Sequence, residues 1–235
     1  MQSYSQAKES LELSSCLLHR WPTSNHRSYQ LKWASTYVTD KITASLNPEA
    51  WNQLLKIISE PSGSDSGIAF ETYVLHAFRE GGHTFEIKDL DNGKSSFLTI
   101  PRHQNTIQFD TIPKIEAGTL YIPKVSNYAC VDLLLAPGDL FQITISEHHP
   151  IKEHLLVKLF ERLRDAGWIN TAQSRLVFVV PSAAYDNFKK QNYTNSQRKV
   201  YTRLPAELQS LKQYALKIDL TSATCGGSPG FRAAE

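Results

Sequence analysis

The sequence predicts a mixed α/β fold, in which a mixed β-sheet is flanked by helices in a restriction-endonuclease-like arrangement. Three stretches carry this prediction: an amphipathic helix over Ile151 to Ala166, a buried strand over Arg175 to Val180, and a hairpin over residues 130 to 146. The order helix, strands, hairpin, helix, strand and helix favours a sheet between helices, because each apolar face must be buried against another element.

Length and composition are those of a chain with a sizeable core. The chain has 235 residues, of which 41% are hydrophobic, which suits one large domain or one domain with an appendage. Its 25 Lys and Arg residues against 23 Asp and Glu residues leave a net charge of +2. This charge excludes a protein that coats nucleic acid through bulk electrostatics, so any phosphate contact must be local.

The cysteines and the longest apolar runs indicate in which cellular compartment the protein is expected. Cys16, Cys130 and Cys225 are far apart and lack CxxC spacing, which argues against a disulfide framework and a cysteine zinc site and favours a reducing compartment. The longest apolar runs have six residues, whereas a membrane-spanning helix needs about 20. The first thirty residues lack the pattern of a secretory signal. We therefore expect an intracellular protein with no membrane partner.

Composition divides the chain into three parts. Residues 1 to 60 combine weakly helical stretches with a better helix over Pro48 to Ile58, which Asn47 caps. The segment Glu60 to Gly67 is rich in Ser, Gly and Pro and marks a boundary. We expect the main domain over residues 66 to 220, and a flexible tail over residues 221 to 235.

The main domain opens with a helix and four short strands. Apolar residues recur at helical spacing from Gly67 to Glu80, and Glu71 falls in the same stripe. The pair Gly81-Gly82 ends this helix. Strands separated by turn residues then follow at Thr84 to Leu90, Phe97 to Ile100, Thr106 to Phe109 and Thr119 to Ile122.

A hairpin comes next. Cys130 to Leu135 and Leu140 to Ser146 are joined by the four residues Ala136 to Asp139, which suits two adjacent antiparallel strands. Because side chains alternate along a strand, Gln142 and Thr144 share a face. In a suitable register Asp132 would converge with them.

The last elements are two helices and two strands. Five apolar residues form one face of the helix over Ile151 to Ala166, which Gly167 ends. After the strand over Arg175 to Val180, Ser182 is expected to cap a helix through about Gln191. A strand near Tyr214 to Leu220 would complete the sheet.

Two carboxylates are the chemical core of the expected site. If Glu71 projects from its helix towards Asp132, the pair and a few further oxygen ligands would meet the needs of Mg²⁺. A metal held in this way activates water and neutralises charge on a phosphodiester.

These residues carry a resemblance to a known family. The pieces are Gly67 to Glu71, Val131-Asp132, Phe141 to Ser146 with His149 to Lys152, and Val177 to Pro181. In order and spacing they resemble the C-terminal nuclease-like domain of Crinkler effectors and retrotransposon hot spot proteins, over roughly residues 66 to 195. That domain is assigned to the PD-(D/E)XK nuclease superfamily. The resemblance implies a Mg²⁺-dependent or Mn²⁺-dependent nuclease that acts on DNA, in the nucleus of its own or a host cell.

The resemblance also implies a role for each site residue. Glu71 matches the helical acid, Asp132 the central metal-binding aspartate, and Gln142 with Thr144 the acid and lysine of the superfamily motif. Thr144 supplies no positive charge, so Lys152 or His149 is expected to replace it.

In that family the domain commonly follows a P-loop ATPase domain. This chain has no Gly-x-x-x-x-Gly-Lys-Ser/Thr segment. The resemblance therefore implies that the ATPase domain belongs upstream in a longer parent protein, with residues 1 to 60 as a remnant of the connection.

Structural roles compete with this interpretation. Glu71 is equally suited to an ion pair or a helix cap, and an aspartate at the position of Asp132 is commonly a turn or hydrogen-bonding residue. The histidines His148, His149 and His154 suggest a transition-metal site, but Pro150 disrupts a common helical register for them.

A basic stretch is the expected nucleic-acid-binding surface. Its residues are Lys189, Lys190, Arg198 and Lys199, interleaved with Tyr185, Tyr193 and Tyr201. Such a mixture holds phosphates and stacks on bases, and it is as common on a solvated helical face. The sequence thus leaves two functions open: an active nuclease, or an inactive nuclease fold that binds nucleic acid or protein.

Overall fold

The computed structural model describes residues 18–22, 29–33, 41, 56, 64–102, 105–124, 128, 130–168, 174–197, 199–201 and 204–220. The chain divides into two compact units, Met1–Thr72 and Tyr73–Glu235.

The first unit contains strands that the sequence did not predict. Strand β1 (Leu18–Pro22) pairs antiparallel with β2 (Tyr29–Trp33), whereas we expected weakly helical stretches there. Of the helix expected over Pro48 to Ile58, only Lys56 is described, and it is helical. Asn47 and the tail over residues 221 to 235 lie outside the described residues.

Helix α4 (Ser64–Glu80) crosses from the first unit into the second. It begins three residues before the expected start at Gly67, inside the segment expected to be a boundary. The helix ends before Gly81-Gly82, as predicted, and these two glycines have φ angles of +60° and +77°. A Cβ atom on Gly81 would lie 2.3 Å from the carbonyl oxygen of Pro101, so only glycine fits this turn.

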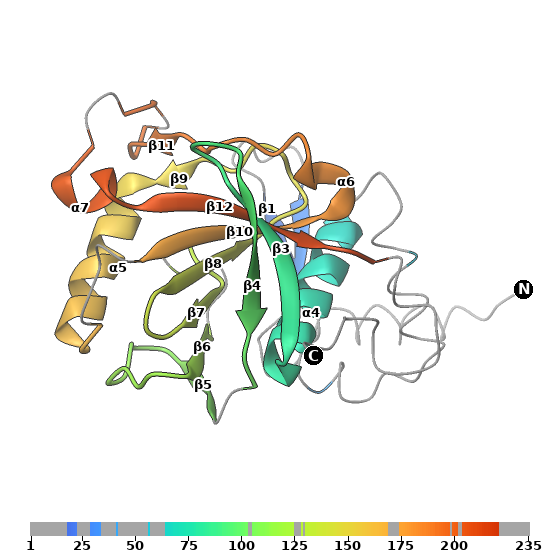
Figure 1. Ribbon diagram of the computed structural model, residues 1–235, viewed down its shortest axis with the longest axis horizontal. Coiled ribbons are helices and arrows are strands. Elements are labelled where there is room, and N and C mark those ends of the chain that lie inside the picture. Colours follow the sequence, from blue (N-terminus) through green and yellow to red (C-terminus); the bar gives the residue numbers. More distant parts are fainter. Residues whose placement is uncertain are drawn as a thin grey trace, which may run out of the picture. The chain divides into compact units, whose positions relative to one another are not determined.

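An eight-stranded sheet organises the second unit, and its order is β4-β3-β12-β10-β8-β7-β6-β5. Its strands are β3 (His83–Asp89), β4 (Ser95–Ile100), β5 (Asn105–Phe109), β6 (Thr119–Pro123), β7 (Leu133–Leu135), β8 (Asp139–Ile143), β10 (Arg175–Pro181) and β12 (Lys212–Ile218). The neighbours β8, β10 and β12 run parallel at the centre (Figure 1). Antiparallel pairs on both sides make the sheet mixed, as predicted.

Helices cover this sheet. Leu156, Leu159 and Phe160 of α5 (Glu153–Asp165) belong to one buried cluster with Leu140 and Phe178 of the sheet. The other face carries Phe141, whose ring lies 4.9 Å, centroid to centroid, from that of Phe78 in α4. Because Gln142 follows Phe141 on the same strand, its side chain points to the α5 face. The prediction of a mixed sheet flanked by helices is therefore confirmed.

The hairpin forms with a shorter connection than expected. Leu135 pairs with Asp139, so Ala136 to Gly138 make a three-residue link instead of four residues. Strand β7 covers only Leu133–Leu135, and Asp132 therefore lies before the strand instead of within it. The backbone N–H of Asp132 nevertheless donates to the carbonyl of Phe141 at 2.8 Å, which prolongs the pairing.

The helix expected from Ser182 to about Gln191 is wrong in length. Helix α6 covers only Ser182–Tyr185, and no side chain caps its start. Beyond the helix the side chains of Phe188 and Gln191 are buried, and tertiary contacts hold the chain there. Gln191 instead donates its backbone N–H to the Gln213 side chain at 2.8 Å.

Three further short elements complete the second unit. Strand β9 (Ile151–Lys152) precedes α5 and pairs parallel with β11 (Tyr193–Thr194). The expected helix over Ile151 to Ala166 therefore starts two residues later, at Glu153. Helix α7 (Ala206–Gln209) precedes β12. Among the residues that the structure describes, no helix is long and apolar enough to cross a membrane.

Candidate functional site

Asp132 and Gln142 are brought together where β7 begins and β8 ends. The amide Nε2 of Gln142 donates to Oδ2 of Asp132 at 2.7 Å. The backbone N–H of Ile143 donates to the same oxygen, also at 2.7 Å. Gln142 is buried and Asp132 is half-buried, so these bonds are shielded from water and hold the carboxylate in one orientation.

Thr144 follows Gln142 but has a different environment. Its backbone N–H donates to the carbonyl of Val179 at 3.0 Å, which continues the pairing of β8 with β10. Its hydroxyl accepts from the backbone N–H of Ser146 at 3.1 Å. Thr144 thus shapes the turn after β8 and carries no charge.

His149 lies near the same face of the sheet. Its ring is 6.3 Å from that of Phe178, centroid to centroid, and Phe178 is the register partner of Gln142 on the neighbouring strand. The backbone N–H of His149 donates to Oε1 of Gln191 at 2.6 Å. His149 is half-buried, whereas His148 next to it is exposed.

Lys152 is exposed and lies within electrostatic reach of this group. Sγ of Cys130 contacts the backbone carbonyl of Lys152 at 3.8 Å. Burial raises the pKa of the Cys130 thiol. The contact with Lys152 and the positive charge of that residue lower this pKa, whereas the negative charge of Asp132 raises it. The charges of Lys152 and Asp132 therefore both reach the Cys130 thiol.

Glu71 lies half-buried on α4 and belongs to the first unit. Its meeting with Asp132 stays a prediction. Within the described part of the chain, no three His, Cys, Asp or Glu residues form a group that could hold a metal ion. The magnesium site and the alternative site at His148, His149 and His154 thus stay hypotheses.

Buried glutamines hold the loop that carries His149, and sequence reasoning missed them. Gln191 Nε2 donates to the carbonyls of Glu147 and Lys189 at 3.0 and 2.7 Å. Gln213, fully buried in β12, donates to the carbonyl of Gln191 at 3.0 Å. A glutamine within the predicted strand near Tyr214 was the one signal available, because a buried amide needs partners.

The structure describes three of the four residues of the expected nucleic-acid-binding surface, and their role stays a prediction. Lys189, Lys190 and Lys199 are exposed, and Lys190 forms an ion pair with Asp91. Arg198 lies outside the described residues.

Two of the three tyrosines expected among these cations are not on the surface. Tyr185 and Tyr193 are buried in the core, whereas Tyr201 is 40% exposed. Bases can therefore stack only on Tyr201 among the three.

Comparisons with known proteins give two distant relatives. The chain is 24% identical over 230 residues to Crinkler effector protein 15 of Phytophthora infestans, which covers 92% of this chain and 33% of that protein. It is also 24% identical over 217 residues to Crinkler effector protein 16 of the same organism, covering 86% of this chain and 31% of that protein. The chain is a distant homologue of Crinkler effector proteins.

The resemblance to Crinkler effectors is thus confirmed as distant homology over most of the chain. The chain spans about a third of the length of the curated relatives it matches. No family model matches the chain, and no solved structure matches it. The superfamily assignment stays a proposal.

Proposed function

We propose that this chain is the nuclease domain of an effector and hydrolyses phosphodiester bonds in DNA. The observation that carries the proposal is the contact between Asp132 and Gln142. The resemblance gives these two positions the metal-binding roles, and the register of β7 and β8 brings them side by side. The distant Crinkler homology supports the effector part of the proposal.

The donor atoms suit a hard cation such as Mg²⁺ or Mn²⁺. Asp132 would ligate through Oδ1, because Oδ2 already accepts two hydrogen bonds. Gln142 donates through its amide nitrogen, so its carbonyl oxygen is the atom suited to a metal. Glu71 would add the second carboxylate. Such a cation supplies charge neutralisation and an activated water when bound. Because Gln142 is neutral, binding should be weaker than at a site with three carboxylates.

The chain's own residues would then hold the phosphate. Lys152 is exposed and its backbone contacts Cys130, two residues before Asp132, so its ammonium group would replace the lysine missing at Thr144. His149 would donate a second hydrogen bond, and Gln191 holds its backbone. Lys189 and Lys199, exposed on the same unit, would bind the DNA backbone further from the cut.

The place of the domain in its protein is part of the proposal. We infer a restriction-endonuclease-like core over residues 66 to 220, downstream of a P-loop ATPase domain in a longer parent protein. Its site of action would be inside a cell, in the nucleus.

A plasmid-nicking assay with Mg²⁺ or Mn²⁺ tests this function. Asp132→Asn removes the charge but keeps an oxygen that can accept from Ile143, so the fold should survive. The matched control is Glu161→Gln, at an exposed carboxylate on α5. We expect nicking by the wild type and Glu161→Gln, and none by Asp132→Asn. Nicking that survives in Asp132→Asn would reject this site.

The second candidate is an inactive nuclease fold that binds nucleic acid or protein. Thr144 favours it, because the residue at the lysine position carries no charge and its hydroxyl is bonded to the Ser146 backbone. If the folded wild type binds DNA but does not cut it with either metal, this candidate replaces the nuclease.

A further inference from the structure

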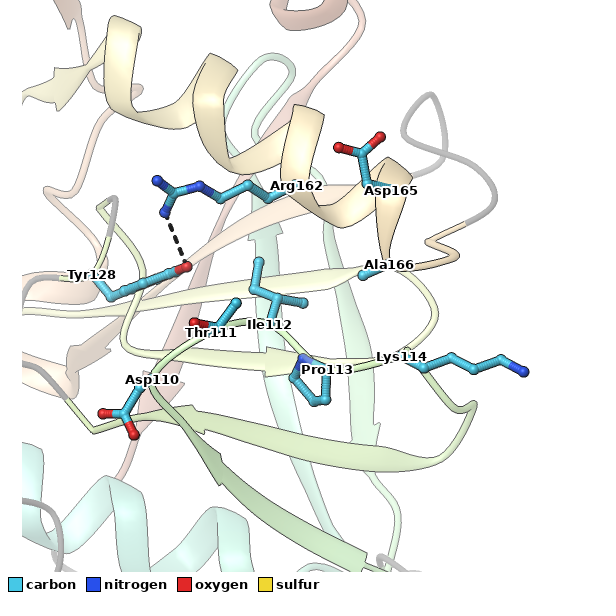
Figure 2. A pocket seen from close by; sticks show the side chains of 9 residues that line it. All are labelled: Asp110, Thr111, Ile112, Pro113, Lys114, Tyr128, Arg162, Asp165 and Ala166. Atoms are coloured by element: carbon cyan, nitrogen blue, oxygen red, sulfur yellow. Dashed lines mark hydrogen bonds between the residues drawn. The ribbon is translucent and has the colours of Figure 1, made fainter.

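A pocket of about 670 Å³ lies between the loop after β5 and the last turns of α5 (Figure 2). It is lined by Asp110, Thr111, Ile112, Pro113, Lys114, Tyr128, Arg162, Asp165 and Ala166. Its volume falls within the range of about 300 to 1,000 Å³ that is usual for small-molecule sites. Neither Asp132 nor Gln142 lines it, so it is separate from the candidate nuclease site.

The walls of the pocket are tied to the rest of the unit. The backbone N–H of Ile115 donates to the carbonyl of Ala166 at 2.8 Å, which joins the loop to the end of α5. The hydroxyl of Tyr121 accepts from the backbone N–H of Glu116 at 2.8 Å. The ring of Tyr128 packs edge-on against that of Phe109, with centroids 5.3 Å apart. A ligand would therefore enter a preformed site and pay little to order it.

Arg162 supplies the positive charge beside Tyr128. Asp110 forms an ion pair with Lys124, whose Nζ lies 2.6 Å from its carboxylate. Lys114 and Asp165 carry opposite charges, and Figure 2 shows both side chains extending away from the middle of the pocket. The two acidic and two basic side chains of the lining balance one another, and the guanidinium of Arg162 is the cation that meets Tyr128.

Tyr128 and Arg162 point their polar groups at one another at one end of the pocket (Figure 2). Nη1 of Arg162 donates to the Tyr128 hydroxyl at 3.2 Å. Because this hydroxyl accepts from Arg162, its own hydrogen can be donated to a ligand, and the guanidinium has further N–H donors. A carboxylate or phosphate matches such a set of donors.

We propose that this pocket binds a small organic anion, a carboxylate or phosphate monoester joined to an apolar group. The charged end bonds to Arg162 and Tyr128, and the apolar end lies against Ile112, Pro113 and Ala166, which line the pocket. This site is independent of the proposed nuclease function.

Ligand-observed NMR titration of the whole chain tests the proposal. The probes are benzoate and phenyl phosphate, which share the anion-plus-ring chemistry, inorganic phosphate, which lacks the ring, and benzylamine, which reverses the charge. We expect benzoate or phenyl phosphate to bind, inorganic phosphate to bind more weakly, and benzylamine not to bind. The stronger of the first two distinguishes a carboxylate ligand from a phosphate ligand.

Variants of two arginines on one helix provide the decisive control. Arg162→Gln should weaken binding of the stronger probe by about tenfold or more, since it removes a charged hydrogen-bond donor. Arg164→Gln removes another exposed charge on α5 that does not line the pocket, and should change binding by less than about twofold. Tyr128→Phe should weaken binding by a smaller factor than Arg162→Gln.

Three outcomes would overturn the proposal: neither organic anion binds the wild type at millimolar concentration, Arg162→Gln and Arg164→Gln weaken binding equally, or benzylamine binds as well as benzoate. Circular dichroism of each variant confirms that the fold is kept.

Discussion

The side-chain amide of Gln142 and the carboxylate of Asp132 are joined by a hydrogen bond of 2.7 Å. The same carboxylate oxygen also accepts from the backbone of Ile143. Asp132, which precedes β7, therefore ties the start of that strand to the end of β8, whatever chemistry it performs. Stability and activity must be measured together to separate these roles.

Replacing Asp132 should destabilise the fold by an amount that depends on the substitute. Asp132→Ala leaves the Ile143 N–H and the Gln142 amide without their acceptor, which should cost about 1 to 3 kcal/mol. Asp132→Asn keeps one oxygen and should cost less than half as much. Urea unfolding measures both values. Equal stability of Asp132→Ala and wild type would contradict the structural role.

The pair Asp139 and Arg175 should stabilise the centre of the sheet. Arg175 donates twice to the carboxylate, at 2.7 and 2.8 Å, across the paired ends of β8 and β10. Burial lowers the pKa of the Arg175 guanidinium. The hydrogen bond to Asp139 and the negative charge of Asp139 raise it by more, so the pKa is raised overall. Asp139 is only 8% exposed, so Asp139→Asn should cost about 2 kcal/mol.

Urea unfolding tests this value against an exposed ion pair. In the pair of Lys124 and Asp110 the side chains are 49% and 66% exposed, so Lys124→Gln should cost no more than about 0.5 kcal/mol. Similar losses for the two variants would show that Asp139 contributes no more than a surface charge.

Acidification should destabilise the second unit through two histidines. Burial lowers the pKa of His76 and of His83, although Glu80 opposes both shifts. In the unfolded chain imidazoles bind protons as the pH falls through about 6.5, whereas the folded chain binds them only at lower pH. The folded state therefore has its full stability from this source above that pH and loses it as the pH falls towards the folded pKa values.

Urea unfolding at pH 7.5, 6.5 and 5.5 measures this loss. The double variant His76→Gln with His83→Gln should lose less stability on acidification than the wild type. His148→Gln, at an exposed position, should behave as the wild type does. Identical pH dependence in the double variant and the wild type would exclude these histidines as the source.

Charge removal should weaken DNA binding unequally at three exposed lysines. Lys189→Gln and Lys199→Gln should each reduce the slope of log affinity against log salt by about one, the effect of losing one phosphate contact. Lys190→Gln should have a smaller effect, because Lys190 is paired with Asp91. Fluorescence anisotropy over a range of salt concentrations measures the slopes.

The control for these lysines is Lys158→Gln, an exposed charge on α5. If it lowers the salt slope as much as Lys189→Gln does, binding is diffuse and the surface around Lys189 and Lys199 has no special role.

Local patterns predicted the elements whose own residues specify them. The apolar spacing of α5 predicted that helix, and the two glycines after α4 predicted where α4 ends. Both signals are local, because helix periodicity and positive φ angles involve only a few consecutive residues. The helix predicted from Ser182 to about Gln191 ends at Tyr185, and the backbone of Gln191 bonds to the Gln213 side chain, a tertiary contact that local helix propensity does not report. The burial of Tyr185 and Tyr193 was missed for the same reason.

By itself the sequence determined the order of the main elements from α4 to β12, the candidate residues Asp132 and Gln142, and the likeness to Crinkler effectors. Only the tertiary structure decided that these two side chains touch, that Gln191 and Gln213 hold the loop of His149, and that Arg162 meets Tyr128 in a pocket. The physical reason is distance along the chain: these contacts depend on strand register and helix packing, which no short stretch of sequence encodes.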